Sequence, residues 1–520
     1  MGKEKEIRVR NFHQAKWGEP IIFELHTEGE RGILIPETEK EIEDCVGDGL
    51  SALPGNIKRK KAPALPEVSQ MRVLKHYLRL SQQCLGADFN IDLGQGTCTM
   101  KYSPKINEFL VRSTKVTELH PLQDESTVQG ALEIIYKLDL FLREISGMSK
   151  FSLQPGGGSQ AIFAMVSIIH AYHRARGESE QRDEIITTIF SHPSDAAAAA
   201  VKGYKVITLY QNEDGLPEVE ALKKAVSNRT AGLLITNPED TGIFNPEIRE
   251  FTRIVHEAGG LCGYDQANAN GILSITRANE ADFDLCFFNL HKTFSSPHGC
   301  GGPATGALGV REKLFDYLPV PIVEFDGHNY FLNYDLPHTI GKVRSFLGVF
   351  PAVLRAYAWI VSLGARGLKE VANTAVLNNN YVFEKVKKLR GASAPYAKGR
   401  HRIEQVRYSW ENLTKETGVT TDDIICRMAD FGFHLWTSHH PFIVPQPFTI
   451  EPTESYSKDE IDEYLAGLAK VVEEAYEEPE KVKNAPYNSV VHKIDHSTLD
   501  DPEKWAITWR SYLKKQKQDQ

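Results

Sequence analysis

The chain is 520 residues long, with 41% hydrophobic and 25% charged residues and a formal net charge of −9. Its length exceeds what one hydrophobic core normally supports, so we expect two to four structural units. No apolar stretch is long enough to cross a bilayer, and the acidic balance gives no reason to expect a nucleic-acid partner.

The N-terminus and the cysteines bear on the cellular compartment. The first twenty residues are charged throughout and lack the apolar segment of a secretory signal. The seven cysteines are scattered and form no CxxC pair. We therefore expect a protein of the reducing cytoplasm.

The N-terminal third, to about Lys150, predicts little regular structure. An irregular arm leads to a helix at Val68–Ser81 and then to a Gly-rich loop at Asp92–Met100. An amphipathic helix follows at Val128–Ile145, where apolar residues recur at helical spacing.

From Gln154 the pattern changes to short apolar runs that alternate with helical segments, which is typical of a mostly parallel sheet. We predict a helix after Gly158 and another at Pro246–Ala258. The predicted strands are Ile185–Phe190, Lys205–Tyr210, Gly232–Thr236, Leu261–Tyr264 and Asp284–Phe288. The sheet is mostly complete by about Val310.

The C-terminal region predicts a small α+β domain. A long helical stretch from Val349 to Lys388 precedes strand-like segments at His401–Tyr408 and Phe442–Ile450 and a helix at Lys458–Glu474. We divide the chain into an N-terminal arm and helical region (1–120), a large domain (121–345), a small domain (346–480) and an extension (481–520). The extension is expected to wrap over the surface or over a partner subunit.

Two charged residues at predicted strand ends carry the main functional argument. Asp265 ends one buried strand, and Lys292 follows another strand 27 residues later. In open α/β sheets, ligands gather at the carboxyl ends of the strands, so both side chains should enter one crevice. Pyridoxal 5′-phosphate (PLP) needs this pair, because a lysine amine condenses with its aldehyde and an acid pairs with its pyridinium nitrogen.

Two further segments fit the same cofactor. Asn237 ends a strand 28 residues before Asp265 and is placed to hydrogen-bond the phenolic oxygen of the ring. The turn Pro155–Ala161 opens a helix, where Gly158, Ser159 and Gln160 would form a phosphate cradle. Each element alone has an ordinary structural explanation, since Gly-rich turns often serve packing and strand-end acids often cap turns. Their order and βα spacing together favour PLP.

Several nearby residues are weaker candidates. His192 lies between a strand and a helix, so it could stack on the cofactor ring or simply cap the helix. His298 begins a glycine-rich turn after Lys292, where backbone can approach a ligand closely. Ser295 could assist phosphate binding or serve an ordinary turn.

Longer phrases resemble a known family, the PLP-dependent glycine decarboxylase of the glycine cleavage system (P-protein), in particular subunit 2 of its two-subunit form. The phrases that carry the resemblance are LPEVSQMRVLKHYLRLSQQ at 65–83, GTCTMKYSPKINE at 96–108, HPLQDESTVQGALE at 120–133, FNLHKTFSSPHGCGGPATGALGV at 288–310 and IVPQPFTIEPTESYSKDEID at 443–462. Together they span almost the whole chain.

The resemblance implies the aspartate-aminotransferase type of PLP fold (fold type I) and a specific reaction. Glycine would lose its carboxyl group as CO2, and its aminomethyl group would pass to the lipoyl arm of H-protein. A homologous subunit 1 would complete the assembly, and an oligomer is implied.

The resemblance also assigns residues. It makes Lys292 the Schiff-base lysine and Asp265 the partner of the pyridinium nitrogen, with His192 as a third catalytic residue. Ala267, His291 and Ser295 would join the cofactor site. The lining on the substrate side would comprise Thr97, Cys98, Lys101 and His298. No metal is implied.

The chain departs from the family's motifs around the pocket. HGTNPAS has become HPSDAAA, so Pro193, Asp195 and Ala196 replace glycine, asparagine and proline. DGANLNA has become DQANANG, which places Gln266 beside Asp265, and Trp436 stands at a proline position. The alternative is therefore a divergent PLP-dependent decarboxylase, lyase or aminotransferase that acts on another small amino acid.

Two other classes of protein compete with an enzyme of this kind. A catalytically silent scaffold would resemble the lysine-less partner subunit, but Lys292, Asp265 and Asn237 are all present. A metal enzyme is disfavoured, because His291, His298 and the pair His439–His440 have no recognised ligand spacing.

Overall fold

The computed structural model describes residues 7–86, 90–99, 101–297, 299, 304–437, 443–490, 493, 501, 505–506 and 508–517. The chain divides into two compact units. The catalytic unit comprises Ala87–Ala485 with Met1–Asn11, and the arm unit comprises Phe12–Gly86 with Pro486–Gln520. The four-part division of the sequence remains a prediction.

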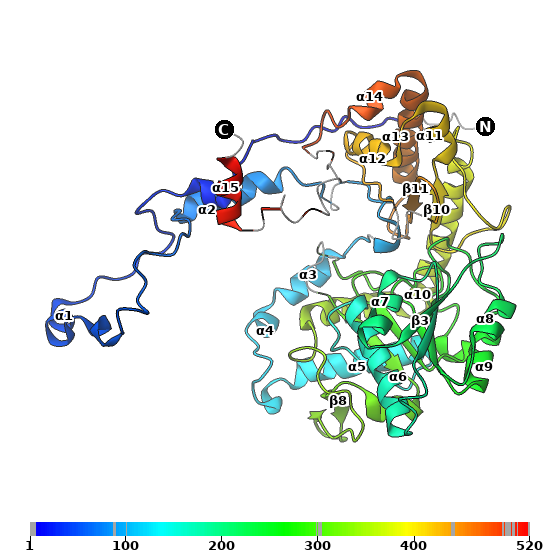
Figure 1. The fold of residues 1–520 in the computed structure, drawn as a ribbon, viewed down its shortest axis with the longest axis horizontal. Helices are drawn as coiled ribbons and strands as arrows, with labels where there is room; N and C mark the ends of the chain where they lie inside the picture. The colour runs from blue at the N-terminus through cyan, green and yellow to red at the C-terminus, as the bar shows by residue number, and fades with distance from the viewer. Residues whose placement is uncertain are drawn as a thin grey trace. The chain divides into compact units, whose positions relative to one another are not determined.

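A seven-stranded sheet, in the order β1-β7-β6-β5-β4-β2-β3, forms the centre of the catalytic unit (Figure 1). The strands are β1 (Lys150–Ser152), β2 (Glu184–Thr188), β3 (Lys205–Leu209), β4 (Thr230–Thr236), β5 (Leu261–Asp265), β6 (Leu285–Asn289) and β7 (Gly306–Val310). Strands β2 to β6 run parallel to one another, whereas β7 pairs antiparallel with both β6 and β1. The predicted mostly parallel sheet is confirmed.

Helices cover both faces of this sheet. They are α5 (Gln129–Ser146), α6 (Gly158–Ala175), α7 (Pro193–Val201), α8 (Val219–Ala225) and α9 (Ile248–Glu257). One apolar core joins α5 and α9 to the sheet, and a second core joins α6 and α7 to it. Because β4, β5 and β6 are buried on both faces, their sequences are continuous apolar runs.

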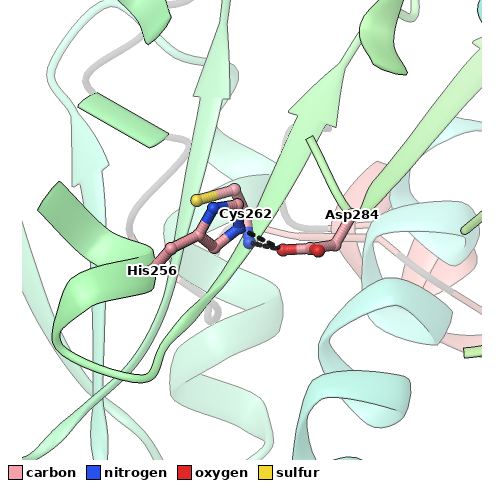
Figure 2. Close-up of side chains that lie close together, drawn as sticks. All are labelled: His256, Cys262 and Asp284. Carbon is pink, nitrogen blue, oxygen red and sulfur yellow. Dashed lines mark hydrogen bonds and ion pairs between the residues drawn. The ribbon is translucent and has the colours of Figure 1, made fainter. Parts of the chain in front are cut away.

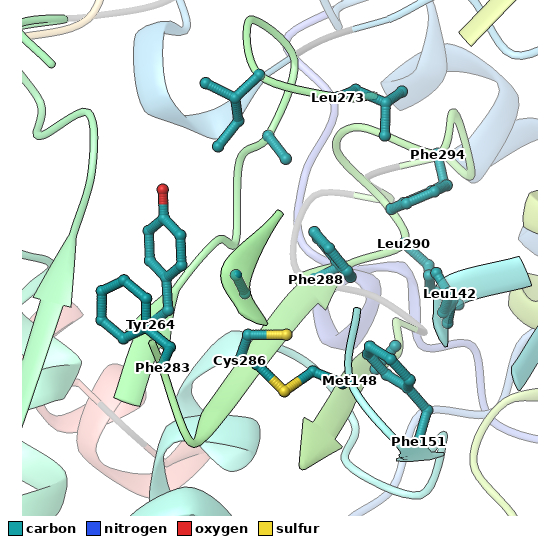
Figure 3. Packing of buried hydrophobic residues seen from close by; sticks show 14 of the residues in the cluster. Leu142, Met148, Phe151, Tyr264, Leu273, Phe283, Cys286, Phe288, Leu290 and Phe294 are labelled. Atoms are coloured by element: carbon teal, nitrogen blue, oxygen red, sulfur yellow. The ribbon is translucent and has the colours of Figure 1, made fainter. Parts of the chain in front are cut away.

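Aromatic packing anchors the segment that carries Lys292. Figure 3 shows Phe288 on β6 between Phe151 and Phe294, with ring centroids 6.1 Å and 5.5 Å away. Phe294 also meets Trp359 of the long helix α10 at 6.0 Å. The turn after β6 is therefore held from both sides by buried rings.

The C-terminal part of the catalytic unit is the predicted α+β layer. Helix α10 (Phe350–Val386) bends at Gly364, and the antiparallel pair β10 (Val406–Ser409) and β11 (Pro447–Ile450) packs on α13 (Lys458–Glu477). The predicted strand His401–Tyr408 begins late, because Ile403 N–H donates to Gly242 of another loop rather than to a ladder. Residues 438–442, where the second predicted strand began, lie outside the described residues.

The remaining elements are short. They are α3 (Lys105–Val111), α4 (Thr114–Thr117), the hairpin β8 (Ile322–Phe325) and β9 (Tyr330–Asn333), α11 (Glu411–Thr417), α12 (Thr421–Ala429) and α14 (Pro479–Lys483), with 3-10 turns at Gly96–Cys98, Glu125–Thr127, Ala278–Ala281 and Glu312–Tyr317. Within the described chain, no helix is long and apolar enough to span a membrane.

The arm unit joins the two ends of the chain. Its helices are α1 (Lys40–Val46), α2 (Gln70–Ser81) and α15 (Trp509–Gln516), with 3-10 turns at Ile22–Leu25 and Gly49–Ala52. Phe23 stacks on Trp509 at 5.0 Å, and Tyr512 donates a hydrogen bond to Glu24. The predicted helix Val68–Ser81 is confirmed as α2, and helix α15 of the C-terminal extension packs against the N-terminal arm.

Removing volume from the sheet core should destabilise the catalytic unit. Leu233 on β4 is fully buried, so Leu233→Ala should lower the free energy of unfolding by about 2–5 kcal/mol, measured by urea denaturation. Leu377 on α10 is 71% exposed, and Leu377→Ala should change it by less than about 0.5 kcal/mol. Equal effects at the two positions would contradict this description of the core.

Candidate active site

Three predicted site residues lie at the carboxyl ends of adjacent strands. Asn237 follows β4, Asp265 ends β5 and Lys292 lies in the turn after β6. Thr236 pairs with Asp265 in the sheet, and Asp265 pairs with Phe287. The Ala269 N–H donates to Thr293 Oγ1 at 2.8 Å and ties the loop after β5 to the turn after β6. The sheet register therefore brings the three side chains to one edge.

Asp265 is a buried carboxyl group aligned by its own loop. Its Oδ1 accepts a hydrogen bond from the Ala267 N–H at 2.8 Å. Burial raises the pKa of Asp265, while this hydrogen bond and the charge of Lys292 act in the opposite direction. A cationic ring nitrogen would favour the ionised form of this carboxyl, which is the complement that a pyridinium group needs.

Lys292 is buried and acts electrostatically on three groups around it. Its positive charge opposes the effect of burial on the pKa of Asp265, of the Cys98 thiol and of Glu451. The lysine amine therefore lies near two carboxyl groups and a thiol.

The Asn237 side chain is hydrogen-bonded within its own loop. Its Oδ1 accepts from the Asn245 N–H at 2.7 Å, and its Nδ2 donates to the Asn245 carbonyl at 3.2 Å. The side chain therefore shapes the loop after β4. One N–H of its amide is left over for a ligand, because an amide nitrogen carries two donors.

The Gly-rich turn before α6 leaves room that a side chain would fill. A Cβ on Gly156 would lie 2.2 Å from Arg344 Nη1, and a Cβ on Gly158 would lie 2.9 Å from Asn289 Nδ2. Gln160 holds the turn, since its Oε1 accepts from the Gly156 N–H at 2.6 Å and its Nε2 donates to the Val343 carbonyl. The N-terminus of α6, with Ser159 in its first turn, and the nearby guanidinium suit a phosphate group.

These residues fit PLP by their own geometry. A buried acid lies beside a buried lysine, and a glycine cradle with a neighbouring arginine opens at the same edge of the sheet. Among the described residues, the buried Gln266 Oε1, Asn289 Oδ1 and Thr236 Oγ1 lack hydrogen-bond partners. Buried polar atoms without partners are uncommon unless a ligand or water completes them.

A polar network that we did not predict lies near Lys292 and forms one wall of the site. Glu451, directly after β11, is buried and accepts from Thr99 Oγ1, Asn268 Nδ2 and Asn270 Nδ2, each at 2.8 Å. Burial raises the pKa of Glu451 to about 6, while these donors and the charge of Lys292 lower it. This network joins the loop before α3 to the loop after β5 beside Lys292.

Lys101 is part of this wall but its charge is already paired. Its Nζ donates to Asn270 Oδ1 at 3.1 Å and to the Thr293 carbonyl at 2.8 Å, and it forms an ion pair with Glu454 at 2.8 Å. The three N–H donors of an ammonium group are therefore all engaged. The contacts favour a role in fixing the loop.

The other predicted residues are placed as follows. Cys98 is half-buried, and burial raises the pKa of its thiol. His192 is the N-cap of α7, with Nδ1 accepting from the Ser194 N–H, and His291 is half-buried next to Lys292. Ser295 Oγ donates to the Tyr102 carbonyl. Thr97 lies in the 3-10 turn Gly96–Cys98, and His298 lies outside the described residues.

The site also contains buried charges that sequence reasoning missed. Asp240 pairs with the fully buried Arg407 of β10, and Glu239 accepts from Thr188 Oγ1. Burial raises the pKa of Glu239 to about 8. The available signal was the acidic pair after Asn237–Pro238, but only the fold shows that both acids point inward.

A cluster of metal-type ligands lies away from this edge. Figure 2 shows His256, Cys262 and Asp284, whose ligand atoms all lie within 4.8 Å of one another. Asp284 Oδ2 accepts from His256 Nε2 at 2.7 Å and from the Cys262 N–H at 2.8 Å, and its Oδ1 contacts Lys313 Nζ at 2.6 Å. The carboxylate is already neutralised, and burial raises the pKa of the Cys262 thiol, so the cluster is a structural ion network.

The fold and this edge together define a PLP-dependent enzyme of fold type I. A profile of the class-V aminotransferases matches residues 156–324, and a profile of the glycine dehydrogenase C-terminal domain matches residues 371–496. A solved glycine decarboxylase (P-protein) of the glycine cleavage system superposes with a TM-score of 0.69 at 18% identity over 84% of this chain and 99% of that chain. A NifS-like protein superposes with a TM-score of 0.57 at 16% identity over 74% of this chain and 100% of that chain.

Proteins of similar sequence narrow the assignment from this class of enzyme to one family. Proteins of Pyrococcus abyssi and Thermococcus kodakarensis, each named "Probable glycine dehydrogenase (decarboxylating) subunit 2", are 48% and 47% identical to this chain. Each alignment covers 96% of this chain and 98% of the relative. The chain belongs to the family of glycine dehydrogenase (decarboxylating) subunit 2.

The ion network around Asp284 should contribute to stability in a pH-dependent way. Burial alone would raise the pKa of Asp284, but His256 and Lys313 hold it below its ordinary value. Its contribution is therefore present above about pH 4 and is lost as the pH falls through the lowered pKa. Asp284→Asn should cost about 1–3 kcal/mol at neutral pH, measured by urea denaturation.

The matched control is Asp282→Asn, whose side chain is 44% exposed and should contribute less than about 1 kcal/mol. A chelator should leave the unfolding midpoint unchanged. A midpoint that falls on chelation and recovers with zinc would contradict the ion-network interpretation.

Proposed function

We propose that the chain catalyses the decarboxylation of glycine with PLP and passes the aminomethyl group to the lipoyl arm of H-protein. The observation that carries the proposal is the position of Lys292 beside the buried Asp265, in a chain that aligns with subunit 2 relatives over nearly its whole length. Bound PLP supplies an aldehyde that condenses with amines and a ring that accepts an electron pair.

Each residue of the cofactor site has a distinct task. Asp265 keeps a negative charge at the ring nitrogen, so that the ring can withdraw electrons from the substrate. Lys292 holds the cofactor between turnovers, and its amine can carry a proton to or from the reacting carbon. The turn from Gly156 to Gln160, with Arg344 beside it, binds the phosphate.

Hydrogen bonds fix the side chains on the proposed substrate side of Lys292. Cys98 and the hydrogen-bonded group of Thr99, Asn268 and Glu451 lie near Lys292, so polar contacts fix this part of the site. Loss of CO2 requires the scissile bond to stand perpendicular to the ring, so a wall fixed by hydrogen bonds can favour one orientation. His192, Ala267, His291 and Ser295 remain proposed cofactor contacts, and Thr97 and His298 remain proposed substrate contacts.

A large cavity supports access by a carrier arm. It has a volume of about 1440 Å³ and reaches His291, the neighbour of Lys292. Its lining includes the basic residues Arg10, Lys105, Arg112 and Arg355, and Glu108 pairs with Arg355 at 2.6 Å. A lipoyl group on a flexible lysine is long and uncharged at its tip, so such a channel would admit it while the basic rim steers an acidic carrier.

The arm unit supports a partner subunit. Helix α2 exposes Met71, Leu74 and Leu78, which lie on one face at helical spacing. Ile33, Leu34 and Ile35 are more than three-quarters exposed, and the described residues of this unit form no apolar core cluster of their own. Apolar surface of this extent is typical of a subunit interface, and we assign it to subunit 1 in a cytoplasmic oligomer.

Charges on this helix face should prevent assembly. Leu74→Glu with Leu78→Glu should abolish co-elution with subunit 1 in size-exclusion chromatography, because burying a charge in an apolar interface is unfavourable. The catalytic unit should keep its circular dichroism spectrum. Lys388→Glu, at an exposed position on the catalytic unit, should leave the complex intact. Retention of the complex by the double variant would contradict the assignment of this face.

The proposed reaction is tested by exchange of labelled bicarbonate into the carboxyl group of glycine. We expect exchange with the chain, subunit 1 and lipoylated H-protein together, and at least a 1000-fold loss, about 4 kcal/mol, with Lys292→Ala. Lys313→Ala, a lysine far from the site in the ion network, should retain exchange.

The alternative function, PLP chemistry on another small amino acid, is favoured by the acids Asp195, Glu239 and Asp240 around the ring end. It predicts no bicarbonate exchange with glycine although PLP is bound through Lys292. A panel of small amino acids, followed by release of CO2 or exchange of the α-proton, would then identify the substrate.

A further inference from the structure

Asp195 is a buried carboxyl group with no evident structural use. It lies in the first turn of α7, and its side chain is completely inaccessible. Neither carboxyl oxygen has a hydrogen-bond partner among the described residues. An ionised carboxylate in such a place would be strongly unfavourable, so the group needs either a proton or a ligand.

The fold brings Asp195 to the ring end of the cofactor site. Ser191, just before α7, accepts a hydrogen bond from the Thr236 N–H at 3.2 Å, which crosses from β2 to β4. Thr236 is in turn the sheet partner of Asp265. Burial and then the charge of Asp265 raise the pKa of Asp195 well above its ordinary value.

The other charged groups around this pair are already accounted for. Lys292 and Asp240 both act on Asp265, and Asp240 is neutralised by Arg407. Glu239 accepts from the Thr188 hydroxyl. His192 caps α7 through Nδ1, which accepts from the Ser194 N–H at 3.1 Å. Asp195 is therefore close enough to Asp265 to be affected by its charge, and among the described residues no cation contacts its own oxygens.

We propose that Asp195 keeps its proton and forms with Asp265 a buried acid–carboxylate pair, which holds a single negative charge where the ring nitrogen of PLP would lie. The inference deepens the proposed function and rests on its cofactor site. Asp265 remains the group that meets the ring, and Asp195 is a positioning residue that acts through it.

The pair has a defined consequence for pH. Two neighbouring carboxyl groups in a buried site cannot both ionise easily, so the second proton is retained to a higher pH. A carboxyl whose folded-state pKa is raised favours the folded state at low pH. This contribution is lost as the pH rises from the unfolded-state value near 4 through the folded-state pKa. An amide at position 195 should not show that loss.

The test compares the wild-type chain, Asp195→Asn and Asp335→Asn by urea denaturation without cofactor, from about pH 5 to about pH 9. Asp335 is exposed, so its variant controls for the loss of one negative charge. We expect Asp195→Asn to gain stability relative to wild type as the pH rises, with a slope of up to about one proton, while Asp335→Asn stays parallel to wild type. A constant difference would mean a purely steric role and would overturn the proposal.

A second measurement covers the case in which Asp195→Asn does not fold. Infrared difference spectra of the wild-type chain, with and without carbon-13 aspartate, should show the carbonyl stretch of a protonated buried acid at neutral pH. The absence of that band would overturn the proposal without any variant.

Reconstitution with PLP separates this inference from the cofactor assignment. The wild type and Asp195→Asn should both develop the near-visible absorbance of protein-bound PLP, and Asp265→Asn should bind PLP more weakly. If the wild type takes up no PLP, the cofactor site itself is wrong. If PLP binds but the stability difference does not change with pH, only the Asp195–Asp265 pair is overturned.

Discussion

The structure depends on one buried charge, the carboxyl group of Asp265 at the carboxyl edge of the central sheet. In a low-dielectric site this group is stable only with partners, and the chain provides the Ala267 N–H and the nearby charge of Lys292. Its position follows from the register of β4, β5 and β6, which fixes Asn237, Asp265 and the turn with Lys292 on adjacent strands. The apolar strands hold that register, since they are buried on both faces.

The rest of the site is assembled from segments far apart in sequence. The loop before α3 supplies Thr99, the loop after β5 supplies Asn268 and Asn270, and the residue after β11 supplies Glu451. The small α+β layer therefore contributes Glu451 and Arg407 of β10 to the candidate site. Such a wall moves only if several hydrogen bonds move together, which gives the pocket a defined shape for a small substrate.

The sequence alone predicted the elements that depend on short-range signals. The five predicted strands of the mostly parallel sheet and the helix after the glycine turn were confirmed, because their apolar runs and turn residues are short-range signals. Strand-end positions of Asp265 and Lys292 followed from the same signals. Sequence could not show that Glu451, Arg407 and Asp195 are buried, because the burial of each depends on segments that are far apart in the sequence. It also could not show that the three donors of Lys101 are engaged or that the Asn237 side chain is hydrogen-bonded to the Asn245 backbone, since these partners lie in distant or later loops.

The most direct test of the account is to reduce the PLP-loaded chain with borohydride and to map the label by peptide mass spectrometry. We predict a single pyridoxyl-modified peptide, with the label on Lys292, and loss of that label in Lys292→Ala. A label on another lysine, or no label in a chain that is folded and saturated with PLP, would contradict the assignment of Lys292 and Asp265 as the centre of the site.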